Sequence, residues 1–310
     1  GGHHKAIVSV ALHPTEPIVL TRGHDGSLRR WQLPNTSEPK LLRHSFEHEY
    51  YLRFSPDGKT YTTGVIYCPW AVRDMATDTE VFSSELQMNC LAQSPDSRYI
   101  AGHCKAKKVV RLWDLELKQE VHRFGATGGD CYGVAFSPDG KRLIAVCVSG
   151  KAWVWDVNTG AEVATLQDVK MNSVEFHPSG KSIAIGHDNG TISFWETKTW
   201  TRQQSVLAHN RTVQCLRYTP DGSTLISAGS DGAIQLRHDQ MHRAYAILNI
   251  GPPGPVVAFD IDASGQYLFA TGPTQVVWVH RLPLAAQGAR WFDEEPRLAS
   301  SPPDQAQPTV

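Results

Sequence analysis

The stretch VAFSPDGKRLIAVCVSGKAWVWD, residues 134–156, contains three apolar segments separated by two tight turns. The first turn is SPDG (137–140), in which Pro fixes φ, Asp can hydrogen-bond the nearby backbone and Gly accepts a positive φ. The second turn is SG (149–150). Because the segment after it is apolar on both faces, the stretch predicts a β-strand buried on both sides.

The same pattern occurs seven times along the 310 residues. The residue that ends the third apolar segment recurs at intervals of 40 to 43, as Trp31, Arg73, Trp113, Trp155, Trp195, Arg237 and His280. A period of about 40–45 residues with short strands between turns is typical of the blade of a β-propeller. One blade cannot bury both faces of its sheet, whereas a closed ring can. We therefore predict an all-β fold, a seven-bladed β-propeller of four-stranded antiparallel blades, with strands of about four to seven residues.

The repeated turn and the terminal Trp-Asp, as in WDL (113–115) and WDV (155–157), resemble the WD40 repeat family in the style of its bacterial members. The resemblance covers about residues 1–282. It implies a non-catalytic scaffold that binds proteins or peptides and needs no cofactor. Similar bacterial propellers are often fused to Ser/Thr kinases or signalling ATPases, so the resemblance implies one module of a larger signalling protein.

The resemblance also implies a buried hydrogen-bonded tetrad within a repeat. The first repeat matches all four positions, with His3, Thr21, Asp25 and Trp31. The sixth repeat matches three, with His209, Ser227 and Asp231, because Arg237 stands where the Trp is expected. The other five repeats lack both the His and the Asp at these positions, so we expect no such tetrad in them.

Ligands of the family usually bind the narrow face, over the central channel. Carried across by position, the expected peptide-binding residues are His24, His48, Tyr50, Asp130, Tyr132, Lys170, Asn172, Asp188, Thr212 and Gln214. They form a polar set with aromatic members, a composition suited to a peptide-binding surface. The alternative is that they are ordinary residues of the rim.

The propeller is expected to span residues 1–293, and the Pro-, Ser- and Gln-rich segment 294–310 to be a disordered tail. The pair Trp291-Phe292 is the only candidate for the outer strand of the seventh blade. The chain begins Gly-Gly-His-His rather than with Met, so we expect it to be a fragment.

The net charge of −1 and the pI of about 7.0 argue against a general nucleic-acid or membrane-surface role, which needs a basic excess. No apolar run is long enough to span a membrane. The six cysteines form no CxxC motif and are expected to be unpaired, which favours a reducing compartment and a cytoplasmic location. Those at equivalent positions, Cys90 with Cys215 and Cys104 with Cys147, are interpreted as small core fillers.

Catalysis and metal binding are not expected. No GxSxG elbow accompanies the His-Asp pairs, and no His or Cys spacing supports a zinc site. His103 and His187, near the ends of second strands, are interpreted as turn residues bonded to the backbone rather than as ligands. The alternatives to an interaction scaffold are a small-ligand sensor, a propeller enzyme domain or a structural spacer.

Overall fold

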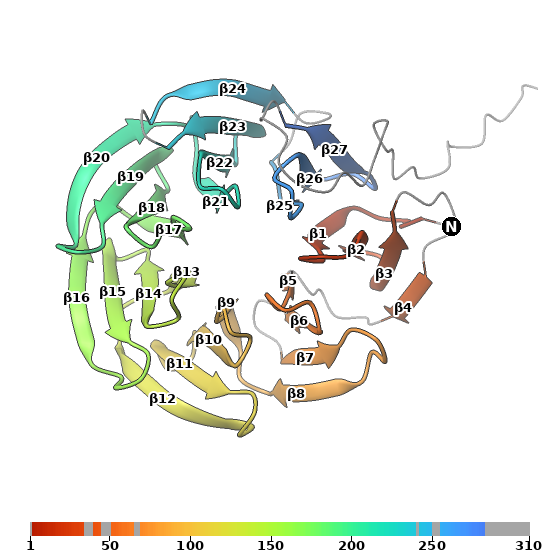
Figure 1. Cartoon of the computed structure of the whole chain (residues 1–310), viewed down its shortest axis with the longest axis horizontal. Coiled ribbons are helices and arrows are strands. Elements are labelled where there is room, and N and C mark those ends of the chain that lie inside the picture. The colour runs from red at the N-terminus through yellow and green to blue at the C-terminus, as the bar shows by residue number, and fades with distance from the viewer. Residues whose placement is uncertain are drawn as a thin grey trace, which may run out of the picture.

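The computed structural model describes residues 2–33, 40–44, 51–64, 69–239, 242–249 and 255–282, which form 27 β-strands in seven sheets around one axis (Figure 1). None of these residues lies in a helix, so the described part of the chain contains no helix that could cross a membrane. The predicted seven-bladed all-β propeller is confirmed.

Each sheet is antiparallel and runs in chain order from the channel outward. The first blade is β1 (Ile7–Leu12), β2 (Ile18–Gly23), β3 (Ser27–Gln32) and β4 (Lys40–His44). The second is β5 (Tyr51–Phe54), β6 (Thr60–Gly64), β7 (Trp70–Asp74) and β8 (Glu80–Ser84). The third is β9 (Met88–Gln93), β10 (Tyr99–Cys104), β11 (Val109–Asp114) and β12 (Gln119–Ala126). The fourth is β13 (Cys131–Phe136), β14 (Arg142–Cys147), β15 (Lys151–Asp156) and β16 (Glu162–Gln167).

The fifth blade is β17 (Met171–Phe176), β18 (Ser182–His187), β19 (Thr191–Glu196) and β20 (Thr201–Leu207). The sixth is β21 (Val213–Tyr218), β22 (Thr224–Gly229), β23 (Ala233–His238) and β24 (Ala244–Asn249). The seventh is β25 (Ala258–Ile261), β26 (Tyr267–Thr271) and β27 (Val277–Arg281), which is three strands within the described residues. The candidate outer strand at Trp291-Phe292 lies outside them. Strand lengths run from four to eight residues, because β12 is one residue longer than expected.

The SPDG turns join the first and second strands through one recurring set of hydrogen bonds. Ser137 Oγ donates to Asp139 Oδ1 at 2.6 Å and accepts from Arg142 N at 2.9 Å, while Gly140 N donates to the Ser137 carbonyl at 2.8 Å. The same side-chain pairing recurs at Ser55 with Asp57 and at Thr219 with Asp221. The Ser or Thr and the Asp of the motif therefore satisfy the backbone of the turn, as expected for these residue types.

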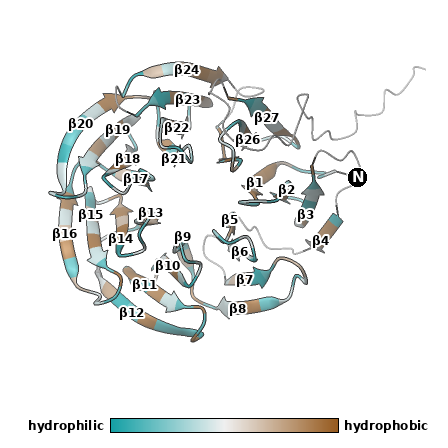
Figure 2. Ribbon diagram, in the orientation of Figure 1, coloured by the Kyte–Doolittle hydropathy of each residue, from teal (hydrophilic) through white to brown (hydrophobic). Residues whose placement is uncertain are grey.

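Neighbouring blades are held together by the aromatic residues that end the third strands. Trp155 stacks on Phe124 of the preceding blade with ring centroids 4.9 Å apart, and Trp113 meets Trp70 edge-on at 5.0 Å. Second strands such as β2 and β22 are buried on both faces, whereas the outer strands β16 and β20 are mostly exposed and carry many hydrophilic residues (Figure 2). The core therefore lies between the blades.

The first and seventh blades close the ring. Ile7 N donates to Thr274 O at 2.8 Å, and Leu12 N donates to Asp260 Oδ2 at 3.0 Å. Apolar residues of both blades share one cluster, which includes Ile7, Val10, Val19, Tyr267, Phe269 and Val277. The two ends of the repeat array are therefore joined by hydrogen bonds and by apolar burial.

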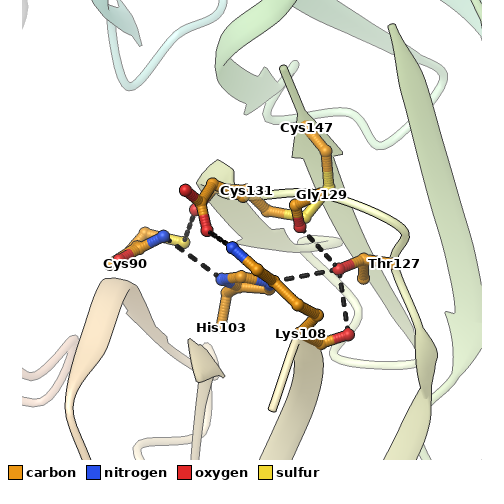
Figure 3. Close-up of a disulfide and its surroundings, with 9 residues drawn as sticks. Cys90, His103, Lys108, Thr127, Gly129, Cys131 and Cys147 are labelled. Atoms are coloured by element: carbon orange, nitrogen blue, oxygen red, sulfur yellow. Dashed lines mark hydrogen bonds and ion pairs between the residues drawn. A yellow bond between two sulfur atoms is a disulfide. The ribbon is translucent and has the colours of Figure 1, made fainter. Parts of the chain in front are cut away.

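The structure corrects the expectation that all cysteines are unpaired. Cys131 and Cys147 are fully buried on β13 and β14 and form a disulfide (Figure 3). The reason is a β-bulge next to Gly133, which pairs with Val146, so that the register slips by one and sets the two cysteines opposite each other. The argument from unpaired cysteines for a reducing compartment is thereby removed, and the cytoplasmic location stays a prediction.

Candidate functional site

The first repeat brings the four residues of the tetrad into one buried network. His3 Nε2 lies 2.8 Å from Thr21 Oγ1, which also accepts from Trp31 Nε1 at 2.7 Å. On the other side of the ring, His3 Nδ1 lies 3.1 Å from Asp25 Oδ1. His3 and Thr21 are buried, whereas Asp25 and Trp31 are partly exposed, so the network connects the loop before β1 to β2, to β3 and to the turn between them.

The two titrating groups of this network shift in the same direction for different reasons. Burial lowers the pKa of His3, although the hydrogen bond and charge of Asp25 oppose it. Burial by itself would raise the pKa of Asp25, but hydrogen bonds from Ser27, from the backbone of His4 and from His3 outweigh it and hold the pKa well below its ordinary value. A neutral His beside an ionised Asp is the state that these shifts favour.

The sixth repeat contains the shorter network that its sequence implied. His209 Nδ1 lies 3.1 Å from Asp231 Oδ1, and His209 Nε2 lies 2.9 Å from Ser227 Oγ. Arg237, in place of Trp, donates to the carbonyl of His242 at 2.6 Å and to Gln235 Oε1 at 2.9 Å. The network therefore ends at the serine.

His103 and His187 are not turn residues, as the sequence had suggested, but fully buried ends of β10 and β18. His187 Nε2 lies 2.7 Å from Ser193 Oγ, which accepts from Trp195 Nε1 at 2.9 Å. The fifth blade therefore has its own His–Ser–Trp chain, built from other positions than those of the tetrad. Counting from fixed positions in the repeat misses it, because the register of β18 and β19 brings the side chains together.

His103 lies in a comparable setting in the third blade (Figure 3). His103 Nε2 is 3.1 Å from Thr127 Oγ1, which is itself within hydrogen-bond distance of the Gly129 carbonyl at 2.9 Å. Burial lowers the pKa of His103 to about 4, although the charge of Asp130 opposes it. This histidine is therefore a neutral structural group at neutral pH.

One end of the propeller is formed by the loops before each inner strand and by the loops between second and third strands. We call this end the narrow face. Seven of the expected peptide-binding residues lie there on the fourth, fifth and sixth blades and are called the face patch: Asp130, Tyr132, Lys170, Asn172, Asp188, Thr212 and Gln214. His24 lies on the first blade, where its backbone N–H donates to Ala6 O at 2.8 Å. His48 and Tyr50 lie outside the described residues.

Contacts between neighbouring loops connect most of the face patch. Lys170 Nζ lies 3.6 Å from Asp188 Oδ2, and Thr212 Oγ1 donates to the Asp188 carbonyl at 3.3 Å. Asn172 Nδ2 donates to Val213 O at 3.2 Å, which ties the fifth blade to the sixth. Gln214 Nε2 donates to Ser230 Oγ at 2.7 Å, and Lys108 pairs with Asp130.

The face patch also includes exposed apolar surface. Tyr132 is 40% exposed, and the neighbouring loop residue Val169 is 47% exposed. The carboxylate of Asp130 is stabilised by the hydrogen bond from Lys108, which outweighs burial and lowers its pKa. The patch thus combines an exposed aromatic ring with charges of both signs.

Below the face patch, the central channel contains a charged network that the sequence analysis missed. Arg217 Nη1 lies 3.0 Å from Glu175 Oε2, and Arg217 Nε lies 3.8 Å from Asp260 Oδ1. Arg53 Nη1 lies 3.6 Å from the same Asp260 oxygen. Each of the four stands three residues before the turn Pro of its repeat, or before the Ala that replaces it, and that equivalence in the sequence could have revealed the network.

The charged side chains in the channel are largely but not fully buried, which alters their titration. Burial raises the pKa of Glu175, although the charges of Arg217 and Arg53 oppose it. Burial also raises the pKa of Tyr51 to about 12. Cys90 and Cys215, expected as core fillers, line the channel cavity, and burial raises the pKa of Cys90 to about 12.

The described residues of the narrow face and the channel offer groups that can bind a ligand. Within the described ranges, no group of three or more His, Cys, Asp or Glu could hold a metal ion. The raised pKa of Cys90 makes it a weak nucleophile. What the narrow face and the channel provide are hydrogen-bond donors, acceptors and an aromatic ring.

Comparison with known proteins agrees with the architecture. A family model described as WD domain, G-beta repeat matches residues 1–32, and one described as Eukaryotic translation initiation factor eIF2A matches residues 126–247. Human Striatin-4 is 26% identical over 270 residues, which is 76% of this chain and 36% of that protein. Actin-interacting protein 1 of Drosophila melanogaster is 29% identical over 190 residues, 58% of this chain and 31% of that protein.

Protein groucho of Drosophila melanogaster is 25% identical over 245 residues, 75% of this chain and 33% of that protein. The chain thus spans about a third of the length of the curated relatives it matches. Several other relatives are WD repeat-containing proteins by name. The WD repeat match, the relatives named as WD repeat-containing proteins and the seven-bladed ring agree with the resemblance to the WD40 repeat family.

Proposed function

We propose that this chain is a non-catalytic interaction module that binds a peptide segment of a partner protein on its narrow face. The observation that carries the proposal is the face patch, in which side chains from three neighbouring blades form one surface over the channel. The relatives support an interaction role, since one of them is named for its interaction with actin. The same proposal makes the chain one module of a larger bacterial signalling protein, which also contains a kinase or ATPase module.

Tyr132 and Lys170 are the strongest candidates for direct contact. Tyr132 presents a large exposed ring, and a Tyr buries much area at a small entropic cost while its hydroxyl keeps a hydrogen bond. Lys170 is highly exposed and weakly paired with Asp188 at 3.6 Å, so its ammonium remains accessible to an acidic group. The occupant that fits is an extended peptide with an apolar and an acidic side chain.

Selection of peptides from a displayed library on the 1–310 chain would test the proposal. For a selected peptide, Tyr132→Ala should weaken binding by about 1–3 kcal/mol, as for an aromatic residue at the centre of an interface. Leu117→Ala is the matched control, because Leu117 is 58% exposed but lies in the turn between β11 and β12, at the opposite end of the blade. Peptides whose affinity survives Tyr132→Ala with Lys170→Ala, but falls with Leu117→Ala, would place the binding surface elsewhere.

A further inference from the structure

The lining of the central channel is divided into a charged part and a part with small side chains. At the level three residues before the first turn of each repeat, four blades contribute charges: Arg53, Glu175, Arg217 and Asp260. The other three blades contribute only methyl groups: Ala11, Ala92 and Ala135. The inner strands that carry these residues surround the axis of the ring (Figure 1). The peptide surface proposed above does not use this level of the channel.

The charges in the channel are not equally satisfied. Arg217 donates to Glu175 Oε2 at 3.0 Å, and Asp260 accepts from the backbone of Leu12 at 3.0 Å. Among the described residues the side chain of Arg53 has one ion-pair partner, Asp260 at 3.6 Å, and no side-chain hydrogen bond, while the charge of Glu175 also acts on it. Its Nη1 atom is enclosed and lacks an acceptor. The side chain as a whole is 26% exposed, so its guanidinium is only partly paired and partly hydrated, and an added acceptor beside it would be stabilising.

A cavity of about 550 Å³ lies directly beside this guanidinium. Its lining includes Arg53 and the small residues Ala92, Gly133 and Ala135. Tyr132 and Gln214 of the face patch border it, and so do Pro56 and Pro138 of the first turns, so the cavity extends along the channel between the two ends of the blades. The volume lies within the range of small-molecule sites.

We propose that the channel binds a small organic carboxylate, with its carboxylate on the Arg53 guanidinium and its short apolar body against Ala92, Gly133 and Ala135. The planar fork of a guanidinium matches a carboxylate through two parallel hydrogen bonds. The methyl and glycine surfaces of the lining offer no polar side chain and leave room for an alkyl group. The site shares Tyr132 and Gln214 with the face patch, but the arginine that would hold the carboxylate lies outside that patch.

The charge balance favours a monoanion over a phosphate. Two arginines and two carboxylates make the network neutral as a whole, and Glu175 and Asp260 would repel a second negative charge. A carboxylate adds one charge, and Arg53 is the channel arginine whose side chain has no hydrogen-bonded carboxylate among the described residues. A polyanion would need several uncommitted cations, and the channel level offers one.

Titration of isotope-labelled 1–310 with butyrate, followed by NMR, tests the proposal. Butyrate should shift the methyl resonances of Ala92 and Ala135 and the amide of Gly133 saturably in the millimolar range, which is about −4 kcal/mol. Butyramide, equal in shape but uncharged, should bind at least about tenfold more weakly, the loss expected for one charged hydrogen-bonding partner. Inorganic phosphate should not compete. Equal binding of butyrate and butyramide, competition by phosphate, or no shift in the channel would each overturn the proposal.

Variants of the chain sharpen the result. Arg53→Gln removes the charge and Ala92→Leu fills the cavity, so each should weaken butyrate at least about tenfold. Arg98→Gln is the control, because this arginine pairs with Asp114 at 2.8 Å away from the channel lining. Wild-type affinity in both channel variants would refute the site. If a variant fails to fold, the comparison of butyrate with butyramide on the wild-type chain still tests the proposal.

A second titration, with peptides, distinguishes a free small acid from the C-terminus of a peptide as the ligand of the channel. Triglycine with a free C-terminus and triglycine amide repeat the comparison for a peptide carboxylate. Binding of butyrate in the channel without a shift at Tyr132 supports a free small acid. Binding of triglycine alone, with shifts at both the channel and Tyr132, would overturn it in favour of a peptide C-terminus.

Discussion

At the scale of single residues, the buried histidines that precede a blade's first strand or end its second strand are stabilised by pairing both ring nitrogens. His3, His187 and His209 each sit between a hydroxyl and a carboxylate or backbone carbonyl. Burial lowers the pKa of all three, so they enter the folded state uncharged. Such a network is worth most when complete and is damaged by loss of one member.

Replacing Asp25 by Ala should lower the free energy of unfolding by about 1–3 kcal/mol. The carboxylate accepts from the backbone of His4 at 2.8 Å and of Ser27 at 2.9 Å, besides its contact with His3, and all these groups would lose their acceptor. Chemical denaturation measures the change. Asp188→Ala, at an exposed loop position, should change stability by no more than about 0.5 kcal/mol. Equal stability of the wild type and the Asp25 variant would contradict a stabilising role for the network.

Acidification should destabilise the protein below neutrality. His103 has a pKa of about 4 in the folded chain against 6.5 in its ordinary state, so between these values the unfolded chain binds a proton that the native chain does not. Stability therefore falls as pH falls through this window. Since one pKa unit is worth about 1.4 kcal/mol, His103 alone should contribute a loss of about 2 kcal/mol between pH 7 and pH 5.

Denaturant melts of the wild type and His103→Gln at pH 7 and pH 5 measure this contribution. The variant cannot titrate at this position and should lose less stability on acidification than the wild type. His4→Gln is the control, because His4 is exposed and its side chain is outside the buried networks. An identical pH dependence of the wild type and His103→Gln would show that His103 is not buried as a neutral group.

At the scale of elements, the turn between the second and third strands of a blade packs closely against the loop that leads into the next blade. The carbonyl of Gly190, between β18 and β19, accepts from Ala208 N at 3.0 Å and His209 N at 2.9 Å in the loop before β21. A Cβ added at Gly190 would lie 1.8 Å from the carbonyl oxygen of His209. The loop between the second and third strands is therefore a backbone contact between blades.

Gly190→Ala should destabilise the protein far more than Gly180→Ala. Both glycines have a positive φ, +84° and +71°, so both variants carry the left-handed strain of about 1–2 kcal/mol. Only Gly190 adds a clash with backbone, since the nearest atom at Gly180 is Pro138 Cδ at 3.7 Å. The difference in unfolding free energy should exceed about 2 kcal/mol. A difference near zero would mean that the blades move apart freely at this contact.

At the scale of the whole molecule, stability depends on the junction of the first and seventh blades, which are far apart in sequence. Asp260 contributes there in two ways, as the acceptor of Leu12 N, 248 residues away, and as the charged neighbour of Arg53 and Arg217. Every other junction joins blades that follow each other in the chain. Only the junction of the first and seventh blades must therefore overcome the entropy of bringing distant segments of the chain together.

Asp260→Ala should cost about 1–3 kcal/mol, because it leaves the backbone N–H of Leu12 without an acceptor. Asp260→Asn retains a side-chain oxygen for that N–H and removes only the charge. If the hydrogen bond at the junction dominates, Asn should recover most of the stability lost in Ala, as measured by denaturant melts. Asn and Ala variants of equal stability would assign the effect to the ion pairs with the arginines instead.

The sequence by itself determined the number of blades and the turns that separate their strands. This was possible because the signals are local and repeated: the SPDG turn needs only neighbouring residues, and the interval of 40 to 43 residues counts the blades. The tetrad positions of the first repeat could be predicted from the sequence for the same reason. The face patch could be named by position, and its binding role stays a prediction.

Only the tertiary structure decided which residues meet across blades and across a slipped register. The bulge beside Gly133 pairs Cys131 with Cys147, and the pairing of β18 with β19 brings His187 to Ser193; neither follows from counting residues along one strand. The channel network joins residues of four repeats, and its members are neighbours only because the ring closes. Contacts of this kind depend on the three-dimensional course of the chain, which a local pattern does not contain.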